Sequence, residues 1–242
     1  MSIRSANGYQ STCSSYQTLA LSMAHATGVV AFDLDGTLIR HSTVSLHMAL
    51  WLGNDDMPRL ERLYAEGKIT NAEAAVEDAR FYRNRARADA CAQLSSIPII
   101  NGVPETTRWL RQRGFLLIIA TITSRFAAEF IQKRYGFDAA SGCVLHENNG
   151  LFTGEVARHF DARDKANFVA DFAQTRGVNP ARVIAVGDST SDLPMFEFAG
   201  LSIALNASEN ARLAADQVVD TDDLQDIIPI IDSYLTKSPA AT

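Results

Sequence analysis

The chain has 242 residues, 47% of them hydrophobic, and its 22 basic and 28 acidic side chains give a net charge of −6. This size and apolar content allow one large domain, or a core domain with a smaller insert. The negative charge creates no field that would attract nucleic acid or an anionic membrane surface, and no apolar run approaches the roughly 20 residues of a membrane-spanning helix. We therefore expect a small-molecule partner.

The first 27 residues are rich in Ser and Thr and are predicted to form an N-terminal extension. Their longest apolar patch, residues 19–24, is interrupted by Ser22 and is short for a signal-peptide core. Three cysteines are widely spaced and lack the spacing of zinc ligands, so we interpret them as packing thiols of a protein in the reducing cytoplasm: Cys13, Cys91 and Cys143.

Residues 29–35, VVAFDLD, have the apolar run of a buried strand and finish in two acids. The following segment, residues 41–97, is predicted to be a small helical unit, with helices over 41–52 and 57–67 and one long helical stretch over 71–96. Thr70 and Glu73 have capping-box spacing at the start of that long stretch.

Beyond Pro98 strands and helices alternate, which is typical of a mainly parallel sheet with crossover connections. The expected strands are 115–121, 181–188 and 201–205, a hairpin is expected over 143–156, and the expected helices are 104–114, 124–136, 165–177, 191–200, 208–215 and 222–235. The pattern predicts an α/β fold: a Rossmann-like, mainly parallel core formed by 28–40 and 98–242, with the α-helical unit 41–97 inserted as a cap.

Polar side chains stand at the ends of three apolar strands: Asp33 and Asp35 after the first, Thr121 after the second and Asp188 after the third. In open α/β sheets ligands bind outside the carboxyl ends of the strands, so these side chains are expected to converge. A single Asp at a strand end is more often a turn or cap residue, but the combination indicates a site. Carboxylates at the edge of a core need a cation or a shifted pKa.

Four segments resemble, in order and spacing, the motifs of the haloacid dehalogenase superfamily of phosphohydrolases: DLDGT at 33–37, Thr121, Lys165 in DARDKAN, and GDSTSD at 187–192. The chain is most similar to the phosphoserine phosphatase branch, which carries a helical cap after the first motif. The resemblance implies that Asp33 is the nucleophile that forms an aspartyl-phosphate and that Asp35 is the general acid and base. It also implies that Thr121 hydrogen-bonds the phosphate and that Lys165 offsets its charge while screening Asp33.

The same resemblance implies a Mg²⁺ cofactor, which prefers oxygen ligands. The implied ligands are Asp33, the backbone carbonyl of Asp35 and Asp188, while Asp192 acts through water or by orienting the site. Gly36 would let the backbone turn around the phosphate, and Thr37 would support the nucleophile loop.

The expected substrate pocket differs from that of the phosphoserine phosphatase branch. Ser42 stands where that branch places a glutamate, the position of its arginine falls near Asp78, and Ile122 and Thr123 stand where two glycines are common. Arg125 follows the second motif at a helix start that is expected to face the site. The other candidates for lining the pocket, each with a surface or packing role as the alternative, are Arg40, His41, His47, Arg80 and Arg83.

We therefore predict a Mg²⁺-dependent phosphatase that hydrolyses a small phosphorylated metabolite through an aspartyl-phosphate. Three alternatives stay open: a phosphoserine phosphatase proper, a phosphomutase or phosphotransferase, and a non-catalytic phosphometabolite-binding protein. A dehalogenase is disfavoured because breaking a carbon–halogen bond requires neither Asp35 nor the magnesium ligands.

Overall fold

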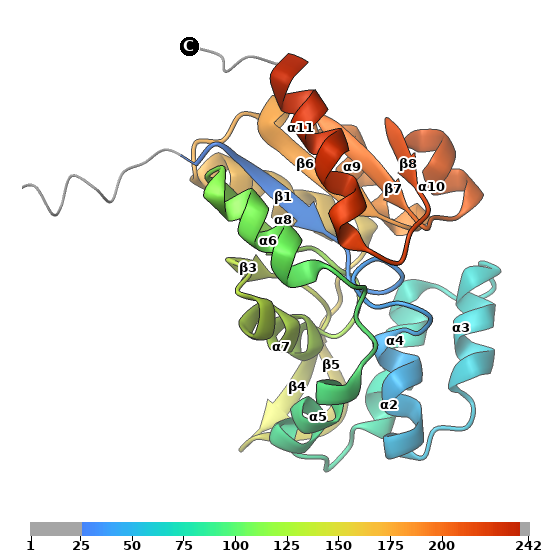
Figure 1. Ribbon diagram of the computed structural model, residues 1–242. Helices are drawn as coiled ribbons and strands as arrows, with labels where there is room; N and C mark the ends of the chain where they lie inside the picture. Colours follow the sequence, from blue (N-terminus) through green and yellow to red (C-terminus); the bar gives the residue numbers. More distant parts are fainter. Residues whose placement is uncertain (1–25, 238–242) are drawn as a thin grey trace, which may run out of the picture.

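The computed structural model describes residues 26–237 (Figure 1). The extension predicted over residues 1–27, with Cys13, lies almost entirely outside the described residues. The core is a parallel sheet of six strands in the order β3-β2-β1-β6-β7-β8. Its strands are β1 (Gly28–Phe32), β2 (Phe115–Ile119), β3 (Ala139–Ala140), β6 (Val183–Gly187), β7 (Leu201–Leu205) and β8 (Gln217–Val219).

The register of the three central strands decides where the site lies. Phe32, the last residue of β1, pairs with Ile119 of β2 on one side and with Val186 of β6 on the other. The residues that follow these strands therefore meet at one edge of the sheet, as the alternation of strands and helices predicts. All residues of β1 and β6 are buried, because helices cover both faces.

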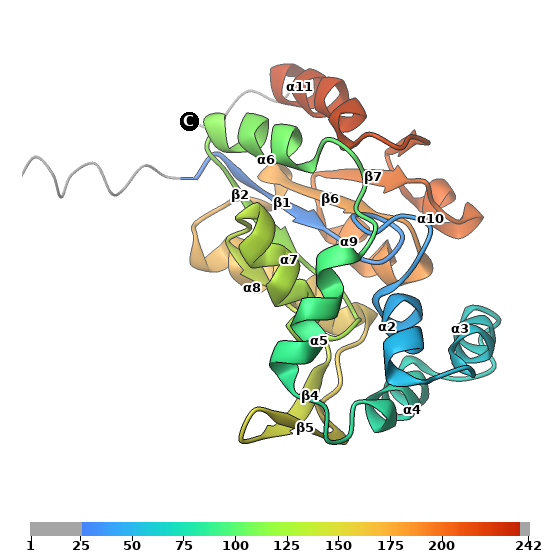
Figure 2. The ribbon, with the colours of Figure 1, turned by 60° about the horizontal axis from the view of Figure 1, so that its bottom comes forward.

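Helices lie on both faces of the sheet (Figure 2), and alternate residues of β1 pack against one helical layer or the other. Phe32 packs into a core with helices α6, α7 and α11, whereas Ala31 packs into a core with α8, α9 and α10. The predicted α/β fold is thus confirmed. These helices are α6 (Val103–Gln112), α7 (Arg125–Tyr135), α8 (Ala162–Thr175), α9 (Leu193–Phe198), α10 (Glu209–Ala214) and α11 (Ile228–Lys237).

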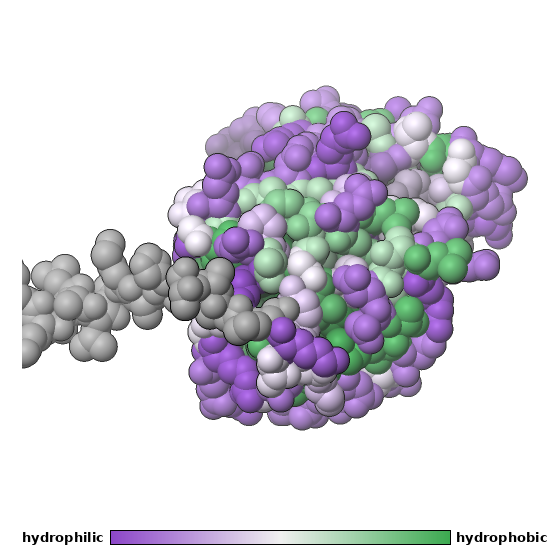
Figure 3. All heavy atoms as spheres, turned by 90° about the horizontal axis from the view of Figure 1, so that it is seen from above, coloured by the Kyte–Doolittle hydropathy of each residue, from purple (hydrophilic) through white to green (hydrophobic). Residues whose placement is uncertain are grey.

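The end of the molecule at which α11 lies is seen in Figure 3, where apolar atoms gather between polar ones. Trp109 of α6 and two residues of α11, Ile230 and Leu235, are partly buried and pack against the core that contains Phe32. Within residues 26–237, every helix is too short or too polar to cross a membrane.

Three helices follow β1 and lie beside the carboxyl edge of the sheet: α2 (Val44–Leu52), α3 (Met57–Ala65) and α4 (Asn71–Phe81). We refer to them as the cap helices. The hairpin β4 (Val144–Asn148) and β5 (Leu151–Arg158) packs against α4 through β5. The expected capping box forms at the start of α4, where Thr70 and Glu73 satisfy each other's backbone N–H groups.

The prediction of one helical stretch over residues 71–96 is wrong, because the chain leaves the helix after α4 and re-enters it at α5 (Arg87–Gln93). Asn84 has a left-handed backbone, with φ 62°, which ends a helix. Its N–H donates to the carbonyl of Phe152 at 2.8 Å, and the N–H of Phe152 donates to the carbonyl of Arg85 at 2.9 Å. Pairing with the β4–β5 hairpin therefore overrides the local helix propensity.

Candidate active site

The loop after β1 holds the first two acids in different surroundings. Asp33 is 4% exposed, and its backbone N–H donates to the carbonyl of Val186 at 2.9 Å. Asp35 lies two residues further along this loop, and its Oδ1 accepts a hydrogen bond from the N–H of Val44 at 2.8 Å. Val44 is the first residue of α2, so this hydrogen bond joins Asp35 to the start of the cap helices.

Lys165 provides the cation that the buried acids require. Its side chain has no exposed surface, and its Nζ donates to Oδ1 of Asp33 at 2.6 Å and to Oδ1 of Asp192. Burial disfavours the charged amine, but the charges of Asp192 and Asp33 outweigh this and raise the pKa of Lys165. The residue is therefore a charged group inside the core, held at the start of α8.

Asp192 is fully engaged by hydrogen bonds, whereas Asp188 is nearly free. Oδ2 of Asp192 accepts from the N–H groups of Asp188 and Ser189, both at 2.9 Å, and its Oδ1 is held by Lys165. The only hydrogen bond that the carboxylate of Asp188 accepts from the other described residues comes from the hydroxyl of Thr37, at 3.5 Å. Burial and the charges of Asp33 and Asp192 raise the pKa of Asp188 to about 9.

These acids fit a hard divalent cation. Asp33, Asp188 and Asp192 each offer a carboxylate oxygen, and the three oxygens lie within 4.8 Å of one another. Carboxylate oxygens are the ligands that Mg²⁺ prefers, and Asp188 has lone pairs to spare. A cation here would remove the repulsion that raises the pKa of Asp188.

Asp35 is suited to hold a proton. Burial and the charge of Asp33 raise its pKa to about 8, although the N–H of Val44 and the hydroxyl of Thr123 act in the opposite direction. Thr121 lies after the neighbouring strand β2 and is 1% exposed. Its Oγ1 accepts from the N–H of Thr123 at 3.3 Å, which fixes the hydroxyl at the strand end.

A cavity of about 910 Å³ opens between the carboxyl edge of the sheet and the cap helices. The site residues predicted from the sequence that line it are Asp33, Asp35, Gly36, Ser42, Thr121, Ile122, Thr123 and Asp188. Three other predicted site residues are buried behind this lining: Thr37, Lys165 and Asp192. Thr37 hydrogen-bonds to Asp188, and Lys165 hydrogen-bonds to both Asp33 and Asp192. Arg125 lies outside this cavity, with its Nε donating to Glu129 at 2.9 Å.

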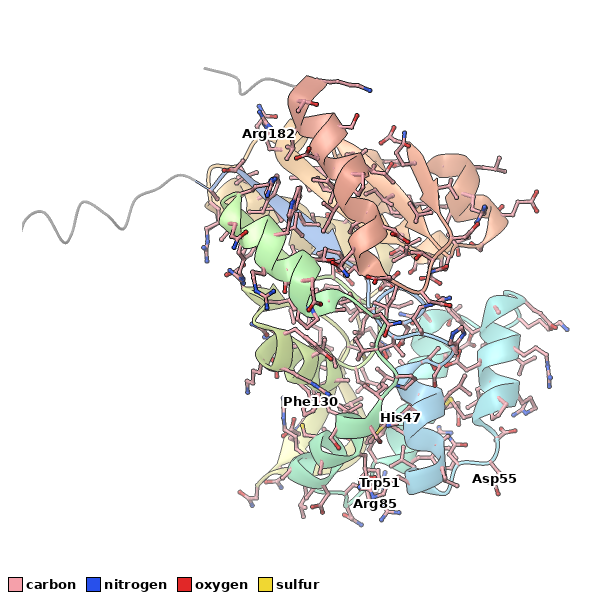
Figure 4. All side chains as sticks on the ribbon, viewed as in Figure 1. His47, Trp51, Asp55, Arg85, Phe130 and Arg182 are labelled. Carbon is pink, nitrogen blue, oxygen red and sulfur yellow. The ribbon has the colours of Figure 1, made fainter. Side chains whose placement is uncertain are left out.

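Most other basic candidates also lie outside the cavity. Arg40 pairs with Asp222 at 3.1 Å, and Arg80 pairs with Glu77 at 2.6 Å. His47 lies near the middle of α2, where its Nε2 is 3.0 Å from the carbonyl of Gln93 (Figure 4). Arg83 packs over Gly154. Of the nominated basic side chains, His41 is the one that lines the cavity.

The cap helices also contribute acidic and aromatic side chains that are not among the site residues predicted from the sequence. Glu61 and Tyr64 of α3 line the cavity, and the Oε1 of Glu61 accepts from the hydroxyl of Thr43 at 2.6 Å. A pattern in the sequence could have indicated that Glu61 faces the cavity. Met57, Leu60 and Tyr64 form an apolar stripe at helical spacing, and Glu61 stands four residues after Met57, beside that stripe.

We expect Gly36→Ala to weaken metal binding more than it weakens the fold. Gly36 has φ 82°, and a Cβ at this position would overlap the carboxylate of Asp188. The left-handed backbone alone should lower the free energy of unfolding by about 1–2 kcal/mol. Displacement of Asp188 should add a loss of Mg²⁺ affinity, which isothermal titration with Mg²⁺ measures.

Gly136→Ala is the matched control for this prediction. Gly136 has φ 74° at the end of α7, and a Cβ there would have no neighbour within 4 Å. It should show the backbone strain in thermal unfolding and leave Mg²⁺ affinity as in the parent chain. Equal Mg²⁺ affinities for the two variants would contradict the close approach of Gly36 to the metal ligands.

Known proteins resemble this chain in sequence. The family model of haloacid dehalogenase-like hydrolases matches residues 30–197. A phosphoserine phosphatase of Archaeoglobus fulgidus is 29% identical over 205 residues, which make up 84% of this chain and 59% of that protein. A phosphoserine phosphatase of Methanocaldococcus jannaschii is 25% identical, over 84% of this chain and 97% of that protein. The chain thus spans less than two thirds of the first relative and nearly all of the second.

Solved structures share the fold. A HAD family hydrolase from Salmonella enterica subsp. enterica serovar Typhi superposes with a TM-score of 0.79 at 21% identity, covering 91% of this chain and 80% of that one. A substrate-bound phosphoserine phosphatase superposes with a TM-score of 0.74 at 24% identity, covering 84% of this chain and 97% of that one.

Proposed function

The chain belongs to the haloacid dehalogenase-like hydrolases, and on that premise we propose that it is a Mg²⁺-dependent phosphatase that hydrolyses a small-molecule phosphomonoester. The observation that carries this proposal is the position of Asp33, at the floor of a cavity with the buried ammonium of Lys165 on its Oδ1. A carboxylate that faces a cavity and is held by a fixed cation is suited to attack phosphorus. The named activity of the relatives supports the same reaction class.

The reaction proceeds in two displacements. In the first, the Asp33 oxygen that Lys165 does not hold bonds to phosphorus, and the bond from phosphorus to the ester oxygen breaks. Asp35 gives its proton to that leaving oxygen, because a carboxyl group with a pKa near 8 is protonated at neutral pH. In the second, Asp35 takes a proton from water, the water oxygen bonds to phosphorus, and the bond between Asp33 and phosphorus breaks, which regenerates the carboxylate and frees inorganic phosphate.

Other residues hold the transferring group. Thr121 donates its hydroxyl to a phosphoryl oxygen, and Lys165 offsets the growing negative charge. Gly36 and Thr37 shape the loop around the phosphate, and Ser42, Ile122 and Thr123 line the space for the leaving group. The helical segment 41–97 serves as a cap over the core formed by 28–40 and 98–242.

Three groups would hold the metal: the carboxylates of Asp33 and Asp188 and the backbone carbonyl of Asp35. When bound there, Mg²⁺ would neutralise charge on the transferring phosphoryl group. Asp192 orients the site, since both of its oxygens are already occupied by Lys165 and by backbone N–H groups.

A panel of phosphomonoesters that includes an aryl phosphate tests the proposal. With Mg²⁺, at least one ester should release inorganic phosphate; EDTA should abolish the release and added Mg²⁺ should restore it. Movement of phosphate between positions of a sugar phosphate without release would favour a phosphomutase instead. No release from any ester would leave the non-catalytic alternative.

A further inference from the structure

The wall of the cavity contributed by the cap is acidic. Glu61 and Asp78 line it from α3 and α4, and the described lining residues include no Arg or Lys. The one basic lining side chain, His41, is 74% exposed and lies 3.8 Å from the carboxylate of Asp222. A carboxylate on the substrate would therefore find no cation in this part of the cavity and would lie beside two other acids, where its charge is unfavourable.

Asp78 is the most informative of these acids because one of its oxygens lacks a partner. The residue is 9% exposed, its Oδ2 accepts from the hydroxyl of Ser45 at 3.2 Å, and its buried Oδ1 has no hydrogen-bond partner within residues 26–237. A buried carboxylate oxygen without a donor is unfavourable. Burial raises the pKa of Asp78 to about 7, against the hydrogen bond from Ser45. The group thus lacks the donor that would hold it ionised.

Among residues 26–237 no side chain donates to that oxygen, and the hydroxyl of Tyr82, one turn further along the chain, is likewise buried without a hydrogen-bond partner. Arg80, two residues along α4, pairs with Glu77 at the surface. Glu61 accepts from Thr43 and has no basic partner among the described residues. The remaining wall is apolar or aromatic, and is formed by Leu46, Met57, Leu60, Tyr64, Ile69 and Leu145. A ligand with a short apolar chain that ends in a positive donor matches both the apolar wall and the unpartnered oxygen of Asp78.

We propose that the leaving group of the substrate carries a cationic amine and no carboxylate, and that Asp78 receives this amine with Glu61 beside it. The substrate class is the phosphomonoester of an amino alcohol. The inference rests on the proposed phosphatase function. It gives Asp78 the opposite electrostatic role to the arginine expected near this position: Asp78 attracts a cation, whereas an arginine would attract a carboxylate. A pocket of this kind selects by repulsion of anionic esters as well as by attraction of cationic ones.

Esters of nearly equal size test the charge preference. We expect kcat/KM to fall from 2-aminoethyl phosphate to n-propyl phosphate by roughly tenfold, the loss of a charge-assisted hydrogen bond. O-phosphoserine and phosphoglycolate, which carry a carboxylate, should be poorer than 2-aminoethyl phosphate. A higher kcat/KM for O-phosphoserine than for 2-aminoethyl phosphate overturns the inference.

Asp78→Asn tests the residue. The amide has the shape of the carboxylate without its charge, so the ratio of kcat/KM between 2-aminoethyl and n-propyl phosphate should fall towards one, mainly through KM. This ratio does not depend on the folded fraction of the sample. Glu77→Gln is the matched control: it removes a charge from the adjacent residue of α4, whose side chain is 43% exposed, and should leave the ratio unchanged. An unchanged ratio in Asp78→Asn overturns the assignment.

Binding of unreactive analogues separates this inference from the phosphatase proposal. By calorimetry with Mg²⁺, 3-aminopropylphosphonate should bind the parent chain more tightly than n-butylphosphonate, and Asp78→Asn should remove the difference. If this holds while no ester releases phosphate, the charge preference stands and the phosphatase proposal fails. Equal binding of the two phosphonates to the parent chain, with phosphate release intact, rejects the inference alone.

Discussion

Asp33→Asn should lower kcat/KM by roughly 10⁴-fold or more, since the amide is no nucleophile and the reaction loses its covalent path. The fold should survive the change. Asn keeps the shape of Asp, and its carbonyl oxygen can still accept from the ammonium of Lys165, which now lies 2.6 Å from Oδ1 of Asp33. Release of inorganic phosphate and thermal unfolding measure the two parts of the prediction.

Trapping of the intermediate separates loss of the nucleophile from general damage to the site. Asp35→Asn is the matched control, because it keeps the nucleophile and removes the acid and base. With a ³²P-labelled aryl phosphate, whose leaving group needs no proton, Asp35→Asn should accumulate acid-stable, hydroxylamine-labile label, and Asp33→Asn should take up none. Substantial turnover by Asp33→Asn would overturn the mechanism.

The position of the site could be predicted because it depends on strand order. Asp33, Thr121 and Asp188 follow the neighbouring strands β1, β2 and β6, and the register of a parallel sheet brings such residues to one edge. Apolar runs bounded by polar residues are local features of the chain, so their ends can be found without knowledge of the tertiary structure.

The burial of individual side chains could not be predicted in the same way, because it depends on contacts between distant segments. Lys165 by itself looks like a solvated helix lysine, but it has no exposed surface because Asp33 and Asp192 bind it inside the core. Asp78 is a buried residue of α4, a helix that packs against α3 and against the distant strand β5. Arg125 starts a helix after the second motif, yet its pairing with Glu129 at i,i+4 keeps it outside the cavity.

The second large effect is expected for Lys165→Met, which removes the cation and leaves its partners inside the core. Asp33 is 4% exposed and Asp192 is fully buried, so neither carboxylate can recover its hydration when the ammonium is lost. We expect the free energy of unfolding to fall by about 3–5 kcal/mol, the usual effect of breaking a buried pair from one side. Urea unfolding without Mg²⁺ measures it, and Lys133→Met, at an exposed position of α7, is the control that should show little change.

The pH dependence of this loss identifies its cause. Burial already raises the pKa of Asp192 against the charge of Lys165, so without the ammonium this pKa should rise further above that of the unfolded chain, and the folded variant binds more protons. Its stability should therefore rise as pH falls, and the deficit should be larger at about pH 8 than at about pH 5. Adding Asp192→Asn should relieve part of the deficit, because it removes one of the two stranded charges. A deficit independent of pH and unaffected by Asp192→Asn would instead indicate lost packing of the lysine stem.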